Sequence, residues 1–109
     1  MSFRLVFTTL PDADSAGKIA KQLVEHRLAA CVNVLAPCRS IYRWQGDVQE
    51  DGEVPLIIKT TADRLPALRD WLQLNHPYEL PEIVAVEVVD GLPDYLAWVA
   101  DSTQADGQV

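Results

Sequence analysis

The sequence predicts an α+β fold in which two β-α-β units share one sheet, the ferredoxin-like split β-α-β sandwich. Two observations predict it: the order of strand-like and helix-like segments along the 109 residues, and a long hairpin that joins the two units. A hydrophobic fraction of 49% and a charged fraction of 23% are ordinary for a globular domain. We therefore expect a single domain over residues 1–102 and a polar, disordered tail over 103–109.

The first β-α-β unit begins at the N-terminus. Phe3 to Thr9 is rich in β-branched and aromatic residues, as is typical of a strand. Asp12 or Asp14 can cap the helix that follows. Its apolar residues recur at helical spacing and predict one buried face, formed by Ala16, Ile19, Ala20, Leu23 and Val24.

The second strand-like segment is interrupted by a proline. It runs from Ala30 to about Leu35 and resumes over Arg39 to Trp44, and Pro37 between them favours a bulge or a sheet edge. Gln45-Gly46-Asp47 has the composition of a turn. Val48 to Thr61 is then the return arm of a long hairpin.

The second unit repeats the pattern of helix and strand. Asp63 is expected to cap a helix that His76-Pro77 ends, because proline disfavours helix in the residue before it. Ile83 to Val89 is nearly all apolar, which is the pattern of a strand buried on both faces. Pro93 opens a short last helix that runs to about Asp101.

This arrangement leaves one face of the sheet bare. Both crossover helices of a split β-α-β fold lie on the same face, and the last helix is too short to cover the other. An exposed apolar sheet of that size would aggregate, so we expect an oligomer to cover it.

Charge and targeting signals narrow the classes of function. Sixteen acidic and nine basic residues give a net charge of −7, which disfavours nucleic acid and anionic membranes as partners. No segment is apolar over the roughly 20 residues that a membrane helix needs, and no signal-peptide pattern is present, so we expect a cytoplasmic protein. Cys31 and Cys38 are too far apart on one strand to pair, and both thiols are expected to be reduced.

The sequence predicts no enzyme. It contains no G-x-S-x-G, Walker A, G-x-G-x-x-G or H-E-x-x-H motif. A small hydrolase on the same fold, such as an acylphosphatase, would need an anion-binding arginine after its first strand. Thr8 to Asp14 contains neither arginine nor lysine, which argues against this alternative.

The densest polar and aromatic segment is Asn75 to Glu82, and it carries His76, Tyr78, Glu79 and Glu82. Two prolines would hold it rigid where it enters a strand. One interpretation is a ligand or metal site. The other is a helix stop whose histidine caps carbonyl groups.

A second set of candidates lies elsewhere in the chain. Lys59 follows a buried apolar run and is expected to be paired, with Glu53 and Glu82 as candidate partners. Large aromatics are enriched in interface anchors, although a small-molecule pocket is the alternative. Four of the chain's large aromatics are candidates for this role: Tyr42, Trp44, Tyr95 and Trp98.

Five motifs follow one another from Phe3 to about Asp101. They are Ala29-Ala30-Cys31-Val32-Asn33, Ile41-Tyr42-Arg43-Trp44-Gln45-Gly46, Glu53-Val54-Pro55-Leu56-Ile57-Ile58-Lys59-Thr60, His76-Pro77-Tyr78-Glu79-Leu80-Pro81-Glu82-Ile83 and Tyr95-Leu96-Ala97-Trp98. In order and spacing they resemble the motifs of the CutA family, the divalent-cation tolerance proteins. The resemblance implies a cytoplasmic homotrimer, similar in architecture to the PII signalling proteins, with a role in copper and divalent-metal tolerance.

The resemblance implies a metal site whose ligands are only partly present in this chain. Family members that bind copper have a cysteine on the first strand and a histidine pair before the Pro-Tyr motif. This chain has Thr8 and Asn75-His76 at those positions, and threonine and asparagine are poor copper ligands. We therefore expect no required cofactor and at most weak binding of copper or another divalent cation through His76, with Glu79 or Glu82 adding an oxygen.

Two functions remain open. The first is a non-enzymatic, trimeric CutA-type protein in metal tolerance. The alternative is a PII-like signalling module that binds a small anion or metabolite in a cleft between subunits, near Lys59, Trp44 and His76. The residues assigned to such a cleft or interface are Cys31, Tyr42, Trp44, Glu53, Lys59, Tyr78, Tyr95 and Trp98.

Overall fold

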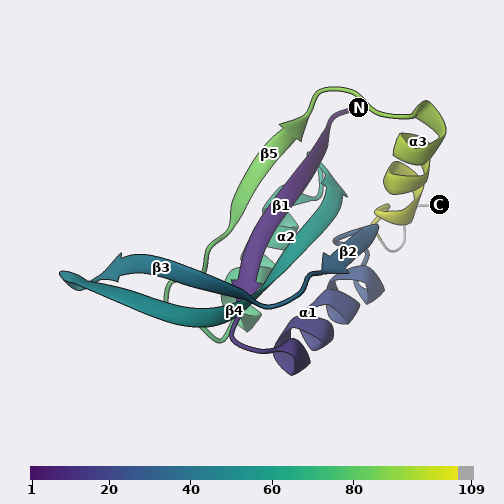
Figure 1. Cartoon of the computed structure of the whole chain (residues 1–109). Helices are drawn as coiled ribbons and strands as arrows, with labels where there is room; N and C mark the ends of the chain where they lie inside the picture. The colour runs from purple at the N-terminus through teal and green to yellow at the C-terminus, as the bar shows by residue number, and fades with distance from the viewer. Residues whose placement is uncertain (106–109) are drawn as a thin grey trace.

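The computed structural model describes residues 1–105, which form one antiparallel sheet with two helices packed on one face (Figure 1). The strands run in the order β2-β4-β1-β5, and β3 pairs with the first part of β4 outside that path. This topology confirms the split β-α-β fold. The elements are β1 (Phe3–Leu10), α1 (Ala13–Glu25), β2 (Cys31–Val34), β3 (Cys38–Trp44), β4 (Asp47–Thr61), α2 (Leu65–Asn75), β5 (Val84–Val88) and α3 (Pro93–Ser102).

Helix α1 begins and ends as its local sequence dictates. The Asp12 carboxylate accepts a hydrogen bond from the backbone N–H of Ser15 at 2.8 Å, which confirms Asp12 as the cap. At the other end Arg27 adopts a left-handed conformation with φ 58°, and the N–H of Leu28 reaches back to the carbonyl of Leu23 at 3.0 Å. This is a Schellman ending, and it turns the chain from the helix into β2.

Helix α2 begins differently from the prediction. Arg64, not Asp63, is the residue that precedes the helix, and no side chain caps it. The hydroxyl of Thr61, the last paired residue of β4, instead accepts a hydrogen bond from the backbone N–H of Arg64 at 3.3 Å. The chain thus enters the helix straight from the strand. Pro66 occupies the first turn as expected.

The core lies between the sheet and the two helices. Every second residue of β1 and β4 points into it, so Val6, Leu10, Leu56 and Ile58 are fully buried. The helices contribute the apolar faces that their spacing predicts, except that Val24, expected on the buried face of α1, lies at its margin and is exposed. From α1 and α2 these are Ala16, Ile19, Leu23, Leu68 and Leu72.

Strand β4 is long enough to serve two partners along one edge. Its residues 47–53 pair with β3, and 56–59 pair with β2. The carbonyl of Pro55 accepts from the N–H of Leu35 at 3.0 Å, in the gap between these two strands. In an antiparallel sheet the N–H and C=O of one residue point to the same neighbouring strand. The N–H that Pro55 lacks would therefore point into this gap, where neither β2 nor β3 pairs with β4.

Strand β3 and residues 47–53 of β4 form a two-stranded arm that projects from the sheet (Figure 1). All residues from 41 to 52 are exposed. Gln45 and Gly46 close the arm with φ angles of 49° and 88°, the pattern of a tight type I′ hairpin turn. An isolated two-stranded ribbon is marginally stable in water, so the arm is a feature that the single chain leaves incomplete.

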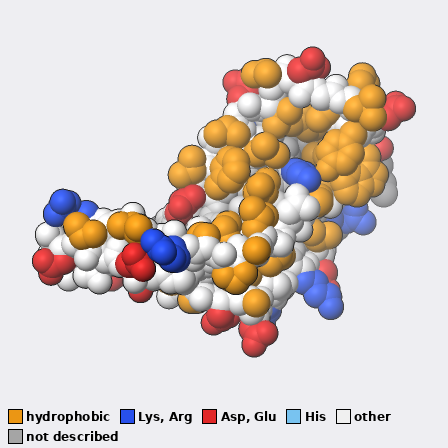
Figure 2. All heavy atoms as spheres, in the orientation of Figure 1, with side chains coloured by type: hydrophobic (Ala, Val, Ile, Leu, Met, Phe, Trp, Pro, Cys, Tyr) orange, Lys and Arg blue, Asp and Glu red, His pale blue; other side chains and the backbone are white. Residues whose placement is uncertain are grey.

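The sheet face opposite the helices is apolar and largely bare. Strand register places Leu5, Phe7 and Ile57 on this face, together with Val84 and Val86 of β5. Figure 2 shows hydrophobic side chains gathered over β5 and β1 on this side. Helix α3 packs only across the end where β1 begins, and a small cavity of about 200 Å³ separates them.

The expectation that β5 is buried on both faces is wrong for the single chain. It is an edge strand that pairs with β1 alone, and Val84 and Val86 are 51% and 43% exposed. Within residues 1–105 no segment covers these side chains on the open face. The apolar composition of β5 therefore reflects a surface that its own chain does not bury.

The C-terminal boundary also differs slightly from the prediction. Thr103, assigned to the tail, is buried and donates a hydrogen bond to the Val99 carbonyl at 2.8 Å. The expected tail therefore begins after Thr103, and its residues 106–109 lie outside the described residues. Among the described residues, no helix is long and apolar enough to cross a membrane.

Two leucines of α2 provide a test of the core. Leu72 is fully buried, whereas Leu74 is 84% exposed. We expect Leu72→Ala to lower the free energy of unfolding by about 2–5 kcal/mol, because it removes buried methyl groups and leaves a cavity. Leu74→Ala is the matched control and should change it by less than about 0.5 kcal/mol. Urea unfolding at one fixed protein concentration measures both, and equal losses would show that α2 does not pack as described.

Candidate functional site

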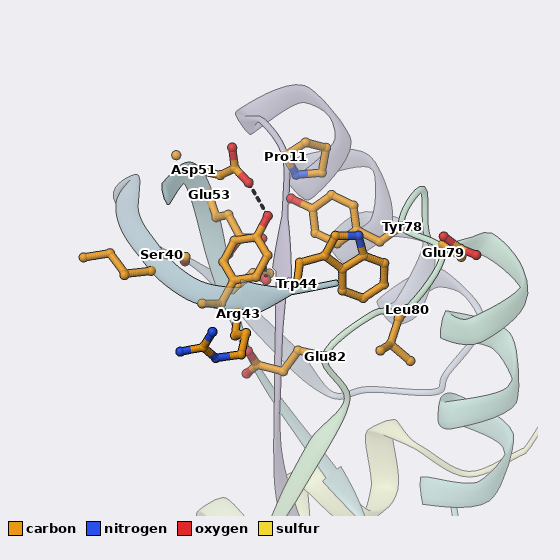
Figure 3. Close-up of a pocket in the computed structure, with 14 residues that line it drawn as sticks. Pro11, Ser40, Arg43, Trp44, Asp51, Glu53, Tyr78, Glu79, Leu80 and Glu82 are labelled. Carbon is orange, nitrogen blue, oxygen red and sulfur yellow. Dashed lines mark hydrogen bonds between the residues drawn. The ribbon is translucent and has the colours of Figure 1, made fainter. Parts of the chain in front are cut away.

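An open cavity of about 860 Å³ lies beside the base of the arm. One wall is formed by β3 and the first part of β4, and the other by the loop between α2 and β5 (Figure 3). Its aromatic lining consists of Tyr42, Trp44 and Tyr78, and its carboxylates are Asp51, Glu53, Glu79 and Glu82. The cavity brings together residues as far apart in the sequence as Thr9 and Glu82, so only the fold assembles it.

The loop is anchored by His76, which ends α2. Its backbone N–H donates to the Leu72 carbonyl at 2.8 Å and its side chain turns inward, where the residue is only 8% exposed. Pro77 follows at once and prevents the helix from continuing. The imidazole ring lies against the Tyr78 ring with centroids 5.0 Å apart.

Both ring nitrogens of His76 are engaged. Nδ1 accepts a hydrogen bond from the backbone N–H of Tyr78 at 3.1 Å. Nε2 lies 2.9 Å from the carbonyl oxygen of Thr9 and 3.2 Å from the Thr8 hydroxyl. A backbone N–H can only donate and a carbonyl can only accept, so the ring is neutral with its proton on Nε2. Burial lowers the pKa of His76, although the Thr9 carbonyl and the Glu53 charge oppose the shift.

With these contacts, neither nitrogen of His76 is free for the metal ion that the sequence led us to expect there. A metal could reach the ring only by displacing the Tyr78 N–H or the Thr9 carbonyl. In the described part of the chain, no three histidine, cysteine or acidic side chains lie close enough to hold a metal ion. Of the two interpretations of this segment, the structure supports the helix stop, with the imidazole bonded across to β1.

Glu53 is the polar centre of the cavity. Its carboxylate accepts a hydrogen bond from the Thr9 hydroxyl at 2.9 Å. Burial alone would raise the pKa of Glu53, but hydrogen bonds from Ser40, Tyr78 and Thr9 outweigh it and hold that pKa below its ordinary value. Burial also raises the pKa of the Tyr78 phenol, and its hydrogen bond to Glu53 raises it further. Glu53 is therefore ionised while Tyr78 keeps its proton and donates it.

The arm contributes the opposite wall. The Tyr42 hydroxyl donates a hydrogen bond to the Asp51 carboxylate across the hairpin, drawn as a dashed line in Figure 3. Trp44, the last residue of β3, also lines the cavity, as do Tyr78 and Leu80 of the loop (Figure 3). Arg43 is the cation of this wall, and its guanidinium donates to the Gly46 carbonyl at 3.1 Å.

The structure divides the predicted cleft residues between two places. Tyr42, Trp44, Glu53 and Tyr78 meet at the cavity, together with Glu79 and Glu82. The others lie on or beside the open sheet face: Cys31 is paired in register with Lys59, and Tyr95 stacks near Trp98 on α3 with ring centroids 5.6 Å apart. Within one chain, Lys59, Trp44 and His76 therefore do not form one cleft.

The expected ion pair of Lys59 with Glu53 or Glu82 is wrong within the chain. Glu53 lies six residues away on the same strand, a distance of about 20 Å. The Lys59 ammonium instead lies 3.9 Å from the Cys31 sulfur, and it has no acidic partner among residues 1–105. Lys59 is thus a half-buried cation on a mostly apolar face.

Sequence reasoning missed Thr9, Ser40 and Asp51 as cavity residues. Their polar side chains carry no signal by themselves. The strand register was the signal that could have found them, because Thr9 lies opposite Pro55, next to Glu53, and Ser40 lies opposite Asp51.

Comparison with known proteins places the whole chain in one group. Residues 4–102 match the family profile described as "CutA1 divalent ion tolerance protein". The chain is 48% identical over 99 residues to the "Divalent-cation tolerance protein CutA" of Thermus thermophilus, covering 91% of this chain and 96% of that one. It is 43% identical to "Protein CutA" of Mus musculus, of whose length it spans 59%. The crystal structure of CutA from Xylella fastidiosa superposes with a TM-score of 0.92 at 44% identity, covering 95% and 100% of the two chains.

The buried imidazole makes stability depend on pH. Because the folded protein holds the pKa of His76 below the 6.5 of an unfolded chain, stability is full above pH 6.5 and falls as the pH drops through the folded value. As the pH falls below 6.5, the loss should be at most about 1.4 kcal/mol per pH unit, the limit that one proton sets. Urea unfolding across this window measures the slope.

Two variants separate the contribution of His76 from those of other groups. His76→Asn should be less stable at every pH but show a flatter slope, whereas His26→Asn, at the exposed end of α1, should keep the parent slope. A parent whose stability does not change over this window would contradict the neutral, buried imidazole.

Proposed function

The chain belongs to the CutA1 divalent ion tolerance protein family, and from this premise we propose that it acts in the tolerance of divalent metal ions, copper among them, as a non-enzymatic homotrimer. The observation that carries the proposal is the match over residues 4–102, which leaves no other domain of the described chain to supply a different activity. A cytoplasmic location is part of the proposal, because the free thiols Cys31 and Cys38 suit a reducing compartment.

The open sheet face supports the homotrimer. Its apolar side chains, among them Val84 and Val86, are costly to leave in water at roughly 25 cal/mol per Å². Both the arm and the edge strand β5 lack a neighbour on one side. A closed ring of identical chains would cover these surfaces, because each chain presents a different one to each of its two neighbours.

Charges placed on the two faces of β5 test the assembly. We expect the parent to sediment as a trimer at micromolar concentration. Val86→Asp, on the open face, should shift the mass towards the monomer, since it would bury a carboxylate in the interface. Ala85→Asp lies one residue away on the helix side of the sheet, at a position that is exposed, and should leave the trimer intact. A monomeric parent would overturn the proposal whatever the variants do.

We propose that tolerance does not depend on tight metal binding at His76. Its two nitrogens are already bonded to Tyr78 and Thr9, and exchanging a buried hydrogen bond for a metal costs about 1 kcal/mol or more before any affinity is gained. Threonine at position 8 adds no ligand of the kind copper prefers. Any binding that remains would be weak and would involve exposed carboxylates such as Glu79.

Calorimetry and a growth assay test this role together. Cu(II) or Zn(II) titrated into the protein should reveal no site that saturates at micromolar free metal, and His76→Asn should not change the result. Expression of the chain in a bacterium that lacks its own CutA-family protein should restore growth on copper-containing medium. Failure to restore growth would contradict the tolerance role. Micromolar binding that His76→Asn abolishes would contradict the indirect mechanism.

A second candidate function is a signalling module, PII-like in architecture, that binds a small ligand. The observation that favours it is the open cavity beside the arm, whose 860 Å³ are within the range of small-molecule sites. In this alternative the arm and the loop after His76 would hold the ligand, and metal tolerance would follow from its signal.

A further inference from the structure

We propose that the cavity beside the arm is completed by the next chain of the homotrimer, whose Lys59 ammonium pairs there with the Glu53 carboxylate. The inference rests on the homotrimer proposed above and names a contact between its subunits. The contact would bring Lys59 and Trp44 together across the interface. The sequence placed these two residues in one cleft, and a single chain keeps them apart.

Lys59 is a cation that its own chain leaves without a counter-charge. Strand pairing sets it between Leu5 of β1 and Cys31 of β2, on the open sheet face. No carboxylate of residues 1–105 lies within ion-pair distance of its ammonium. The Asp90 carboxylate, which lines the same small cavity at the end of this face, accepts instead from the N–H of Gly91 at 2.8 Å. A trimer that covers this face would bury the ammonium, and a buried charge is costly unless it is paired.

Glu53 is a carboxylate whose charge is also uncompensated in the single chain. The groups that hydrogen-bond to it are neutral hydroxyls, those of Thr9, Ser40 and Tyr78. They hold the pKa of Glu53 below its ordinary value, so the side chain is ionised. The charge that acts on it from nearby is that of Asp51, which has the same sign. A carboxylate offers about four acceptor positions, so one remains for a further donor.

The surfaces around the two charges are complementary in polarity. The walls around Glu53 are aromatic and are formed by Tyr42, Trp44 and Tyr78 (Figure 3). Rings of this kind can cover the methylene groups of a lysine side chain while its ammonium reaches a charge. Arg43 is the cation among the lining residues, and it donates to the Gly46 carbonyl at the turn of the arm. The cavity thus presents apolar walls and a negative charge, and the open face presents an apolar surface and a positive one.

The two charges cannot meet within one chain. Lys59 and Glu53 project from the same side of β4 and lie about 20 Å apart along it. A surface with a negative site at one end and a positive site at the other can pair with copies of itself head to tail. Such heterologous contacts form a ring when the rotation between copies closes. Each chain of a closed trimer then gives its lysine to one neighbour and receives a lysine from the other, which leaves neither charge unpaired.

A double-mutant cycle on subunit exchange tests the pair. Unlabelled and isotope-labelled full-length protein are mixed, and native mass spectrometry follows the formation of mixed trimers. Lys59→Met and Glu53→Gln should each raise the exchange rate at least about tenfold, because either change leaves the other group buried without its partner. The double variant should exchange no faster than the faster single variant.

The coupling is diagnostic because the two positions are far apart in one chain. Substitutions more than about 10 Å apart normally have additive effects, so coupling between these two reports a contact between chains. Additive effects, or a Lys59→Met variant that exchanges at the parent rate, would overturn the proposal.

Two control variants separate the ion pair from general damage to the interface. Glu79→Gln makes the same change in another carboxylate of the cavity and should combine additively with Lys59→Met. Coupling of Lys59 to Glu79 in place of Glu53 would overturn the assignment. Lys59→Arg keeps the positive charge and should exchange more slowly than Lys59→Met. Equal rates for these two variants would show that the charge is not what matters and would also overturn it.

Carbodiimide coupling of the parent protein tests the contact without any substitution at Glu53. An amide between Lys59 and Glu53 would join two chains, since the two residues are about 20 Å apart within one chain. Peptide mass spectrometry of the covalent dimer should identify this amide. Lys59→Arg should remove it, because a guanidinium does not form the amide, whereas Lys18→Arg on α1 should not. A covalent dimer joined only at other residues would contradict the pair.

The outcomes separate this inference from the homotrimer on which it rests. A trimeric parent with additive variants keeps the homotrimer and overturns the pair. A monomeric parent has no subunits to exchange, so the homotrimer and the pair fail together. A dimeric parent with coupled variants overturns the homotrimer but supports the pair, because two antiparallel chains can also place each Lys59 on the Glu53 of the other.

Discussion

Strand β4 is the constraint on which the rest of the structure depends. Its 15 residues pair with β1 on one edge and with β2 and β3 in succession on the other. Because side chains alternate along a strand, this one segment decides what faces the helices and what faces the open side. Leu56 and Ile58 build the core, Ile57 and Lys59 lie on the open face, and Glu53 reaches the cavity. Pro55 marks the point where one edge partner replaces the other, at no cost in hydrogen bonds.

The sequence predicted the fold well because the spacing of apolar residues shows which side chains are buried. The apolar spacing in α1 and α2 and the alternation in β1 and β4 each allow one buried face, and the cap of α1 was narrowed to Asp12 or Asp14. Predictions that needed three-dimensional register were less successful. Lys59 was paired with Glu53 because opposite charges stand near each other in the chain, yet strand geometry holds them about 20 Å apart. Strand β5 was taken as buried on both faces because an apolar pattern does not say which chain provides the cover.

The candidate site was predicted only in part, because its contacts also depend on three-dimensional register. Composition indicated the segment from Asn75 to Glu82, and the structure brings Tyr78 from it into contact with Glu53. The role of His76 depended on backbone groups that no sequence pattern displays, the N–H of Tyr78 and the carbonyl of Thr9. Thr8 and His76, the two positions where the resemblance led us to look for metal ligands, do meet, at 3.2 Å.

The arm has a consequence for how the protein folds. Its strands are adjacent in sequence and joined by a two-residue turn, so it can form within about 1–10 μs of collapse. Pairing of β1 with β4 joins residues more than 40 positions apart and comes later. A nascent ribbon with free edges therefore exists before the surface that receives it. Charges along it, among them Arg39, Arg43, Asp47 and Glu50, act as gatekeepers that keep two such ribbons from pairing edge to edge during synthesis.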